Sequence, residues 1–542
     1  MKLFPIGLTA IPRRRGLRCW ALWLVFLGTG AGGLFGSSTS ADVVDLGPKL
    51  QPFIAREQIP GMAALVLRGD RIVAEGVAGI RKKGSPEAVK MGDEFEIASC
   101  AKAMTATLAA MLVEQGKLRW DTSLADIFGD SASKVDPAWT RVTVLQLLHH
   151  RSGITKDHYV RFLASTLFAG GSPTVERRRY AEKELSHPPD IAPGTRFVYA
   201  NTNYILIAAA LEKITGQKWE DLIRERLFQP LGMTTAGIGP PGTPGQIDQP
   251  WGHGGRRLLS LIPMSQGDEI PFDPGSGSAD FPLAGAPAGL VHMSVADWAK
   301  FVVLQLRGDP VNPHCEPALL SPESFAALHS PDPAAGNSGG FDCYAAGWSV
   351  GARPWAKGGR PGDKGLVLWH PGDNGRWNCV VWIAPEIDFA VLVACNRASM
   401  WVQCDEVAAA LVHEFVSETK RVSIPGMGLQ GRWEAFFWGQ ADGMQRLRLA
   451  LEINDANTDL PKGTLVSVDE GNSRFPVTGI SRTNGVFRIE FKAIHAVFQG
   501  ELSPDGSEIS GHWEQKGSNR PLVFRRLPQP AAAAGLAVPR PP

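Results

Sequence analysis

The chain contains few tyrosines and cysteines and has almost no net charge. Among its 542 residues only 5 are tyrosine and 7 are cysteine, and 55 Lys and Arg face 54 Asp and Glu. No two cysteines have the C-x-x-C spacing, so a thiolate metal site is not predicted. Because neither sign of charge forms a long run, nucleic acid is not predicted as a partner. The 60 Gly and 41 Pro are typical of a compact protein with many turns and loops.

Long apolar runs are also missing, except near the N-terminus. A cationic segment precedes the apolar run from Cys19 to Gly36, and small residues follow up to Ala41. This order predicts a signal peptide at residues 1–41 and an exported protein, periplasmic or secreted, with no stable membrane span after cleavage. The alternative is an uncleaved membrane anchor, because the run is near the shortest length that spans a bilayer.

A chain of 542 residues is expected to contain two or three folded units. Residues 42–425 mix helical and strand-like patterns, which predicts an α/β protein with an antiparallel sheet and a helical region. Residues 428–528 consist of short alternating runs separated by turn residues, which predicts a separate small all-β barrel or sandwich. The final residues, 529–542, are predicted to be a disordered tail.

Three local patterns organise the first region. The runs on either side of Gly69 and Asp70 predict a β-hairpin. Residues 101–115 are nearly all helix formers, apolar around most of the girth, and predict a buried central helix. The runs that contain Cys379 and Cys395 predict a second hairpin in which the two thiols lie nearly opposite each other. Both a disulfide and a pair of buried free thiols fit that placement.

The first candidate for chemistry is the segment Ser99-Cys100-Ala101-Lys102, at the start of the predicted central helix. Residues i and i+3 share a helix face, so the Lys102 amine can reach the Ser99 hydroxyl. A helix N-terminus also favours the negative charge that develops during acyl transfer. Serine needs a base to become nucleophilic, and a lysine enclosed by apolar residues can lose its proton near neutral pH. Alone, the pattern also fits a helix cap followed by a solvated lysine.

The second candidate is Tyr199-Ala200-Asn201. A phenol beside an ammonium is easier to ionise, so Tyr199 is predicted to act as a general base and then to protonate the leaving group. Asn201 offers a donor and an acceptor, which suits it to hold Lys102 and a substrate carbonyl together. The alternative for a tyrosine in front of a helix is ordinary packing.

The third candidate is His370-Pro371-Gly372, between an apolar strand and a loop. A small residue at this point lets substrate lie along the strand edge, where the N–H groups of Asp373 and Ser99 would form an oxyanion hole. Pro371 cannot donate a ladder hydrogen bond, which is tolerated only on an edge strand. His370, Gly372 and Asp373 are therefore predicted to bind substrate, although His-Pro-Gly alone is more often a turn.

Two further patterns favour structural roles. Gly347 to Gly351 match G-x-S-x-G, but that motif needs a strand-to-helix turn and the following residues cannot begin a helix, so Ser349 is predicted to lie in a strand. His149 and His150 are adjacent, whereas a metal pair on one helix face needs i, i+3 or i, i+4 spacing. Capping and packing are predicted for these two histidines, and buried packing for Cys100.

In this order, S-x-x-K at Ser99, Y-x-N at Tyr199 and H-x-G at His370 resemble the serine β-lactamase and penicillin-binding superfamily. The similarity is greatest to the class C β-lactamase-like group of esterases and D-amino-acid-specific peptidases, and connecting segments such as VTVLQLLHHRSGI and PAGLVHMSVADWAKF share it. The resemblance covers Val43 to Ser423. It implies a β-lactamase/transpeptidase-like domain: an antiparallel sheet flanked by helices, a mainly helical subdomain, and a catalytic cleft between them. The all-β region resembles lipocalin-like domains fused to such hydrolases.

The resemblance implies a serine hydrolase that acts through an acyl-enzyme on an ester or amide, from a small molecule or a peptide. Ser99 would be the nucleophile and Lys102 and Tyr199 its proton-handling partners, without a metal or organic cofactor. Many antibiotic-hydrolysing relatives have K-T-G where this chain has His370 and Pro371, and Asp373 adds a negative charge that disfavours a substrate carboxylate. The alternatives are a β-lactamase or D,D-carboxypeptidase and, in another class, a non-catalytic penicillin sensor or binding protein.

Overall fold

The computed structural model describes most of the chain from residue 43 to residue 527. The described ranges are 43–130, 134–166, 170–255, 257–258, 262–263, 270–276, 281–332, 343–417, 429–438, 446–455, 462–468, 473–483, 485–503, 505–515 and 517–527. The predicted signal peptide, the boundary between the two predicted domains, and the predicted tail lie outside these ranges. Within them, no helix is both long and apolar enough to cross a membrane.

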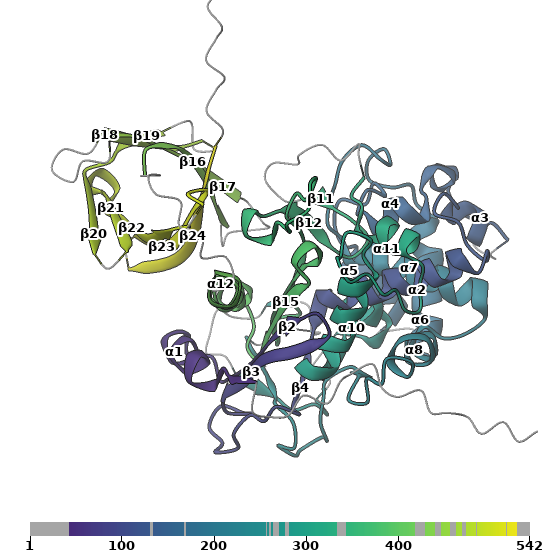
Figure 1. Ribbon diagram of the computed structural model, residues 1–542. Coiled ribbons are helices and arrows are strands. Elements are labelled where there is room, and N and C mark those ends of the chain that lie inside the picture. The colour runs from purple at the N-terminus through teal and green to yellow at the C-terminus, as the bar shows by residue number, and fades with distance from the viewer. Residues whose placement is uncertain are drawn as a thin grey trace, which may run out of the picture. The chain divides into compact units, whose positions relative to one another are not determined.

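An eight-stranded sheet organises the first part of the chain (Figure 1). Its strand order is β1-β3-β2-β15-β14-β13-β12-β11, and every neighbouring pair is antiparallel except β1 with β3. The predicted antiparallel sheet is thus confirmed, with one parallel pairing at its edge. The strands are β1 (Val44–Asp45), β2 (Gly61–Arg68), β3 (Arg71–Gly79), β11 (Cys343–Tyr344), β12 (Ser349–Ala352), β13 (Leu366–Asp373), β14 (Asn378–Ala384) and β15 (Phe389–Cys395).

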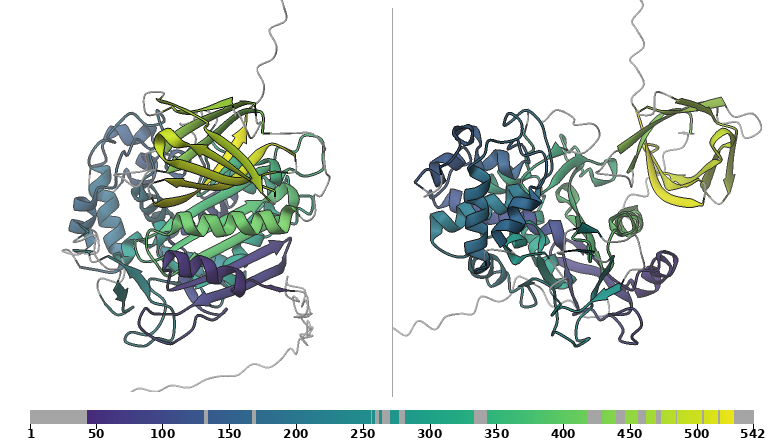
Figure 2. Two further views of the ribbon diagram at one scale, coloured as in Figure 1. Left: turned by 90° about the vertical axis from the view of Figure 1, so that its left-hand side faces the viewer. Right: turned by 180° about the vertical axis from the view of Figure 1, so that it is seen from behind.

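Helices cover both faces of this sheet. On one face, α1 (Gly47–Glu57) and α12 (Trp401–Ser417) lie side by side and contact β3 and β14 (Figure 2). On the other face, α10 (Val295–Gly308) contacts β2 and β15. The larger hydrophobic core lies on that second side and continues into the helical region. This region contains α2 (Ala101–Glu114), α3 (Leu124–Phe128), α4 (Val144–Leu148), α5 (Tyr159–Thr166), α6 (Pro173–Leu185), α7 (Asn201–Thr215), α8 (Trp219–Ile223), α9 (Ala286–Gly289) and α11 (Pro322–His329).

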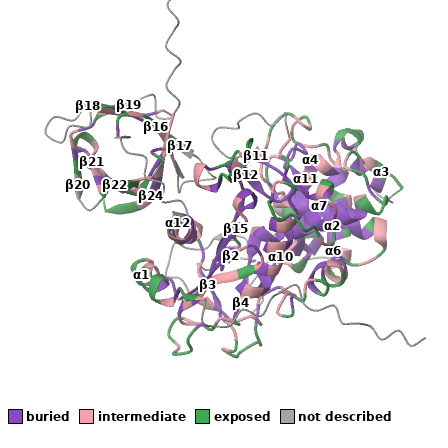
Figure 3. Ribbon diagram, in the orientation of Figure 1, coloured by how far each residue is buried: buried purple, intermediate pink, exposed green. Residues whose placement is uncertain are grey.

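The predicted central helix is α2, which the burial colouring shows as an enclosed rod (Figure 3). Twelve of its fourteen residues are buried, because small and apolar side chains occupy nearly every position of its surface. Gly116 follows it with φ +66°, a left-handed conformation that glycine adopts without strain and that ends the helix. Since α2 is packed on all sides, the residues at its N-terminus are held in fixed positions.

Three short sheets complete this region. β4 pairs with β10, which in turn pairs with β5, while β6 pairs with β9 and β7 with β8. β10 contributes the backbone oxygen of Val291, which accepts from Ile97 N–H at 2.9 Å just before the candidate serine. The strands are β4 (Glu94–Glu96), β5 (Gly237–Ile238), β6 (Gly252–Gly254), β7 (Arg257–Leu258), β8 (Ile262–Pro263), β9 (Ile270–Phe272) and β10 (Val291–Ser294).

The two predicted hairpins are present, but the cysteines of the second do not face each other. β2 and β3 join at Gly69 and Asp70, as predicted. In the β14–β15 ladder Cys379 is opposite Ala394, one position away from Cys395 in register. Successive side chains of a strand point to opposite faces, so the two thiols belong to different cores. The expectation that they lie nearly opposite is therefore wrong.

Different cysteine pairs come close together. The sulfur of Cys379 lies 3.4 Å from that of Cys100, and the sulfur of Cys395 lies 3.7 Å from that of Cys404. All the cysteines that the structure describes are free thiols, and these four are buried. Cys100 is thus a packing residue, as predicted, and Ser349 lies in strand β12, also as predicted.

The second part of the chain is one curled antiparallel sheet of nine strands, as Figure 1 shows. Its order is β19-β18-β17-β16-β24-β23-β22-β21-β20, and its inner face packs around residues such as Trp433, Phe498 and Phe524. The prediction of a small all-β unit is confirmed, and a single curled sheet forms it instead of two layers. The strands are β16 (Gly431–Trp438), β17 (Arg446–Asp455), β18 (Lys462–Ser467), β19 (Ser473–Pro476), β20 (Gly479–Thr483), β21 (Val486–Phe491), β22 (Ala496–Leu502), β23 (Glu508–Gln515) and β24 (Ser518–Arg526).

Candidate active site

Ser99 lies in a tight turn that leads directly into α2. The turn is the 3-10 segment η1 (Ala98–Cys100), and its first residue, Ala98, has φ +42°, a left-handed conformation that is uncommon for a residue with a Cβ. Such local strain persists only where the surroundings enforce it, and it is frequent at active sites. Here the neighbours leave little room, because a Cβ at Gly289 would lie 3.2 Å from the carbonyl carbon of Ala98.

Lys102 lies one helical turn after Ser99, and its side chain is completely buried. Its Nζ is 2.9 Å from Ser99 Oγ, 2.8 Å from Asn201 Oδ1 and 2.6 Å from the backbone oxygen of Ala288. Burial lowers the pKa of this amine to about 7, while the Asp157 carboxylate acts in the opposite direction. A substantial fraction of Lys102 is therefore neutral near pH 7.

The three partners of Lys102 fix the direction in which a neutral amine would point. A carbonyl oxygen and a side-chain amide oxygen can only accept hydrogen bonds. The two hydrogens of a neutral amine are therefore directed to Ala288 and Asn201, which leaves its lone pair facing the hydroxyl of Ser99. This arrangement allows Lys102 to take the Ser99 proton without moving.

Asn201, the first residue of α7, is oriented by a carboxylate that the sequence patterns did not single out. Its Nδ2 donates to Asp157 Oδ2 at 2.9 Å, and Asp157 Oδ1 accepts from the backbone and hydroxyl of Thr202 at 2.8 and 3.0 Å. Because a carboxylate only accepts, the amide oxygen of Asn201 must face Lys102. Asp157 lies in an irregular segment with no recognisable spacing to the other site residues, so no sequence signal marked it.

Tyr199 reaches the same place from the segment before α7. Its side chain is hydrogen-bonded to Ser99, and the Lys102 Nζ lies 4.9 Å from the centre of its ring. Burial raises the pKa of the phenol above its ordinary range, although the hydrogen bond to Ser99 acts in the opposite direction. The sequence predicted that Tyr199 would ionise more easily beside an ammonium. The pKa of the phenol is raised instead, because desolvation by burial is the largest effect on it. Tyr199 is a neutral phenol at physiological pH.

His370 is enclosed beneath the site instead of lining it. Its Nδ1 is 2.6 Å from the backbone oxygen of Pro371, which can only accept, so Nδ1 carries the proton and Nε2 accepts from the hydroxyl of Tyr344 at 3.0 Å. Burial, and then the charge of Lys102, lower the pKa of His370 to about 3. The imidazole is neutral, and no polar ring nitrogen is left to bind substrate as predicted.

The small residue at position 372 is required by the protein itself. A Cβ on Gly372 would lie 2.4 Å from the Cys379 sulfur and 2.6 Å from the backbone oxygen of Ile97. The missing side chain therefore makes room for the serine turn. β13 is an internal strand, yet β12 pairs only with residues 366–369, so Pro371 lies beyond the end of that ladder and needs no donor there.

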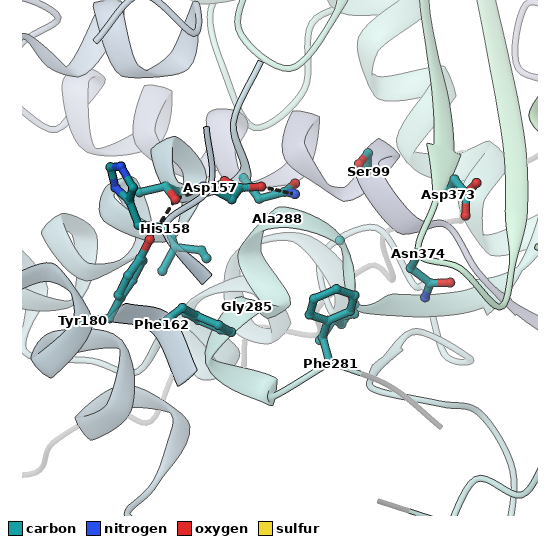
Figure 4. A pocket seen from close by; sticks show the side chains of 15 residues that line it. Ser99, Asp157, His158, Phe162, Tyr180, Phe281, Gly285, Ala288, Asp373 and Asn374 are labelled. Atoms are coloured by element: carbon teal, nitrogen blue, oxygen red, sulfur yellow. Dashed lines mark hydrogen bonds between the residues drawn. The ribbon is translucent and has the colours of Figure 1, made fainter. Parts of the chain in front are cut away.

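A pocket that is partly open to solvent adjoins Ser99. In Figure 4, Ser99 and Asp373 lie at one end, while His158, Phe162 and Tyr180 lie at the other. Among the described residues that line it, none is Lys or Arg. Nor do the described residues contain a group of three or more His, Cys, Asp or Glu side chains placed to hold a metal ion. The lining residues are Ser99, Asp157, His158, Phe162, Tyr180, Asn201, Thr202, Ile205, Phe281, Gly285, Ala288, Gly289, Leu290, Asp373 and Asn374.

Comparison with curated proteins finds relatives of several activities. Penicillin-binding protein 4 of Amycolatopsis lactamdurans is 31% identical over 251 residues, which are 46% of this chain and 60% of that protein. A D-aminopeptidase of Brucella anthropi is 27% identical over 38% of this chain and 37% of that protein. A lovastatin esterase of Penicillium rubens is 26% identical over 28% of this chain and 41% of that protein. The chain thus spans less than two thirds of each relative's own length.

Solved structures share the fold. The crystal structure of SurE aligns with a TM-score of 0.54 and 21% identity, over 89% of this chain and 98% of that one. An octameric penicillin-binding protein homologue from Pyrococcus abyssi aligns with a TM-score of 0.52 and 17% identity, over 88% and 98%. The family model described as Beta-lactamase matches residues 48–413, more than half of the chain. The chain therefore belongs to the Beta-lactamase family, within the superfamily of serine β-lactamases and penicillin-binding proteins.

Proposed function

We propose that this protein is a serine hydrolase that cleaves an ester or amide through an acyl-Ser99 intermediate, as a carboxylesterase or a D-peptidase-like enzyme of the class C β-lactamase-like type. The observation that carries the proposal is the environment of Lys102. Two of the three hydrogen-bond partners of its amine can only accept, and the third is the Ser99 hydroxyl at 2.9 Å. With a pKa of about 7, the amine is available as the base that serine needs.

The proposed reaction proceeds by acylation of Ser99 and then by hydrolysis of the acyl-enzyme. Neutral Lys102 takes the proton of Ser99 while Oγ bonds to the substrate carbonyl carbon, and the carbonyl oxygen becomes an oxyanion. When the bond to the leaving group breaks, that group receives a proton from the neutral phenol of Tyr199, which Lys102 reprotonates. Water then attacks the acyl-enzyme by the reverse proton path and releases the acid. Tyr199 serves as proton donor and relay, consistent with its raised pKa.

The oxyanion would be stabilised by the backbone N–H groups of Ser99 and Asp373. Ser99 lies in the turn before α2, so its N–H belongs to the positive end of that helix. Asp373 ends β13 and lines the same pocket as Ser99. Donors fixed by a buried helix and a sheet need no rearrangement as charge develops.

The pocket favours a substrate without a negative charge. Its described lining includes Asp157 and Asp373 and no Lys or Arg, while Phe162, Ile205 and Phe281 provide apolar surface. A substrate carboxylate beside these described lining residues would find no Lys or Arg side chain to pair with. The alternative, a β-lactamase or D,D-carboxypeptidase, is supported by similarity to penicillin-binding protein 4. Similarity to a D-aminopeptidase and to an esterase supports the uncharged amide or ester.

Two further expectations belong to this proposal. The cationic and apolar order of residues 1–41 supports export, so that the enzyme would meet its small-molecule or peptide substrate in the periplasm or outside the cell. The curled nine-stranded sheet supports a lipocalin-like module. Neither expectation changes the chemistry at Ser99.

The decisive experiment is intact-protein mass spectrometry after incubation with an activated aryl ester. The wild-type chain should gain one acyl group, and Ser99→Ala should gain none while unfolding at the same temperature. Ser349→Ala is the matched control, because Ser349 carries the competing G-x-S-x-G pattern but is buried in β12. Loss of labelling in Ser349→Ala, or labelling of Ser99→Ala, would contradict the proposal.

Turnover assays then separate the substrate classes. A short-chain aryl ester and a D-amino-acid amide should be hydrolysed faster than a chromogenic cephalosporin, which carries a carboxylate. Faster cephalosporin turnover would favour the β-lactamase alternative. If no member of the ester, amide and lactam panel reacts, the non-catalytic sensor or binding protein becomes the better description.

A further inference from the structure

We infer that His150 is the positioning residue of Tyr199: it holds the phenol against Ser99 and Lys102 by binding the backbone on both sides of it. The inference rests on the proposed function of Tyr199. His150 is the second residue after α4, and the sequence predicted only a capping or packing role for it. His150 is not among the residues that line the pocket, so the effect of its replacement on catalysis would be indirect.

The backbone contacts come from the two neighbours of Tyr199. The carbonyl oxygen of His150 accepts from Val198 N–H at 2.9 Å, and its Nδ1 accepts from Ala200 N–H at 3.3 Å. One residue therefore binds the backbone on both sides of Tyr199, at the Phe197–Val198 peptide and at the Tyr199–Ala200 peptide. A phenol held at both flanks has little freedom to leave the serine.

The imidazole ring also packs on the phenol. Its centre is 4.3 Å from that of Tyr199, with an angle of 37° between the rings, and 4.7 Å from that of Tyr344. Tyr344 in turn donates to His370, so the far side of the stack is anchored to the strand beneath the serine. Three of the five tyrosines of this chain, Tyr199, Tyr204 and Tyr344, surround this one histidine.

The charge state of His150 suits this position. Since Nδ1 accepts from a backbone N–H, and also from the amide of Asn203 at 3.0 Å, the single ring proton is on Nε2 and the ring is neutral. Burial, and then the charge of Lys102, lower the pKa of His150 well below its usual value. A neutral ring keeps Tyr199 in place without adding a positive charge that would disturb the lysine.

The backbone of His150 shows that the placement is enforced by its surroundings. Its φ is +54°, in the left-handed region that few residues other than glycine occupy, although histidine and asparagine are among those that tolerate it. His150 as a whole residue is 1% exposed. Few residue types both adopt this conformation and present an acceptor to Ala200 N–H.

The test is a double-mutant cycle between His150 and Tyr199. His150→Ala removes ring and acceptor, and should lower kcat about 10- to 100-fold with little change in KM, since small misplacements of a catalytic group cost about that much. His150→Asn retains an acceptor and tolerates the left-handed backbone, so it should lose less. Tyr199→Phe should then cost much less in either variant than in the wild-type chain, because the phenol is already displaced.

A merely structural role would leave the two effects multiplicative, as is usual for independent sites. Multiplicative effects in the cycle would therefore overturn the inference. His149→Asn is the matched control: His149 is buried and adjacent but has no described contact with Tyr199, and its combination with Tyr199→Phe should be multiplicative. If His150→Ala does not fold, the His150→Asn cycle decides.

Failure of the proposed function is distinguishable from failure of this inference. If the wild-type chain is not labelled by any acyl donor, the function of Ser99 is contradicted. The placement of Tyr199 is then judged by hydrogen exchange of the amides of Val198 and Ala200. Exchange at Ala200 should rise in His150→Ala and remain near wild-type in His150→Asn. Unchanged exchange in both variants would overturn the positioning role.

Discussion

The side-chain amide of Asn201 is held in a single orientation by Asp157. The amide nitrogen donates to the carboxylate at 2.9 Å, and the amide oxygen consequently accepts from Lys102 at 2.8 Å. The carboxylate therefore acts on the lysine twice. It directs an acceptor toward the amine, and its negative charge raises the pKa of the amine against the larger lowering effect of burial.

Asp157→Asn should shift the acid limb of the pH–rate profile to lower pH. Without the negative charge, burial lowers the pKa of Lys102 further below about 7, so the neutral amine persists at more acidic pH. The plateau rate should fall as well, because an amide at position 157 no longer dictates which way Asn201 points. Acylation rates from pH 5 to pH 9 measure both effects. An upward shift of the limb would contradict the assignment, and Asp121→Asn, at an exposed surface carboxylate, should change neither.

For the wild-type chain, the acylation rate should rise with pH and reach half of its plateau near pH 7. The sign follows from the role: the base is the neutral amine, which is the form present above its pKa of about 7. Lys102→Arg keeps the charge but cannot lose a proton, so it should lower the plateau rate about 10²- to 10⁴-fold and remove the limb near pH 7. A rate limb near pH 10 in place of pH 7 would mean that the amine is not neutral at physiological pH and does not serve as the base there.

The local part of this site was predictable and the long-range part was only partly so. The i, i+3 relation of Ser99 and Lys102 follows from helix geometry once α2 is recognised from its composition. The predicted burial of that helix also led to the prediction that Lys102 can lose its proton near neutral pH. The approach of Tyr199, by contrast, depends on contacts far apart in the chain, and only the order of the three motifs pointed to it.

The ionisation of Tyr199, the placement of two cysteines and the role of Asp157 were not predicted correctly from the sequence, each for a physical reason. Desolvation of Tyr199 outweighs its proximity to a cation, and a pattern of letters does not show how deeply a phenol is buried. The hairpin of Cys379 and Cys395 was recognised, but a shift of one residue in register places side chains on opposite faces. Asp157 has no motif at all, because it acts from an irregular segment that only tertiary folding brings to Asn201.

Gly372→Ala should destabilise the protein, because the added methyl group overlaps the Cys379 sulfur and the Ile97 carbonyl at 2.4 and 2.6 Å. Overpacking of this kind typically costs about 1–3 kcal/mol. Displacement of Ile97 would also move the serine turn, so acylation should slow even where the chain remains folded. Denaturant unfolding and labelling rate measure the two consequences.

Gly359→Ala is the matched control for this substitution. A Cβ at Gly359 meets no atom within 4 Å, so the same chemical change should leave stability and labelling near wild-type values. Equal destabilisation by the two substitutions would show that the loss comes from the backbone preference of glycine and not from the contact with the serine turn.

Asp373→Asn should improve the binding of carboxylate substrates without affecting neutral ones. Asp373 is exposed, lines the pocket that adjoins Ser99, and bears a carboxylate there. The backbone N–H of Gly375 donates to its Oδ1 at 2.6 Å, and asparagine retains an oxygen for that bond. The local turn should therefore persist, and the difference between the variants reports charge.

Exposed charges interact by about 0.2–1 kcal/mol, so KM for a chromogenic cephalosporin should fall about 1.5- to 5-fold in Asp373→Asn. KM for a neutral aryl ester should be unchanged. Because salt screens exposed charges, the difference between wild type and variant toward the cephalosporin should shrink as ionic strength increases. An equal change in KM for both substrates, or one insensitive to salt, would mean that Asp373 acts through the shape of the pocket instead of through repulsion of a substrate carboxylate.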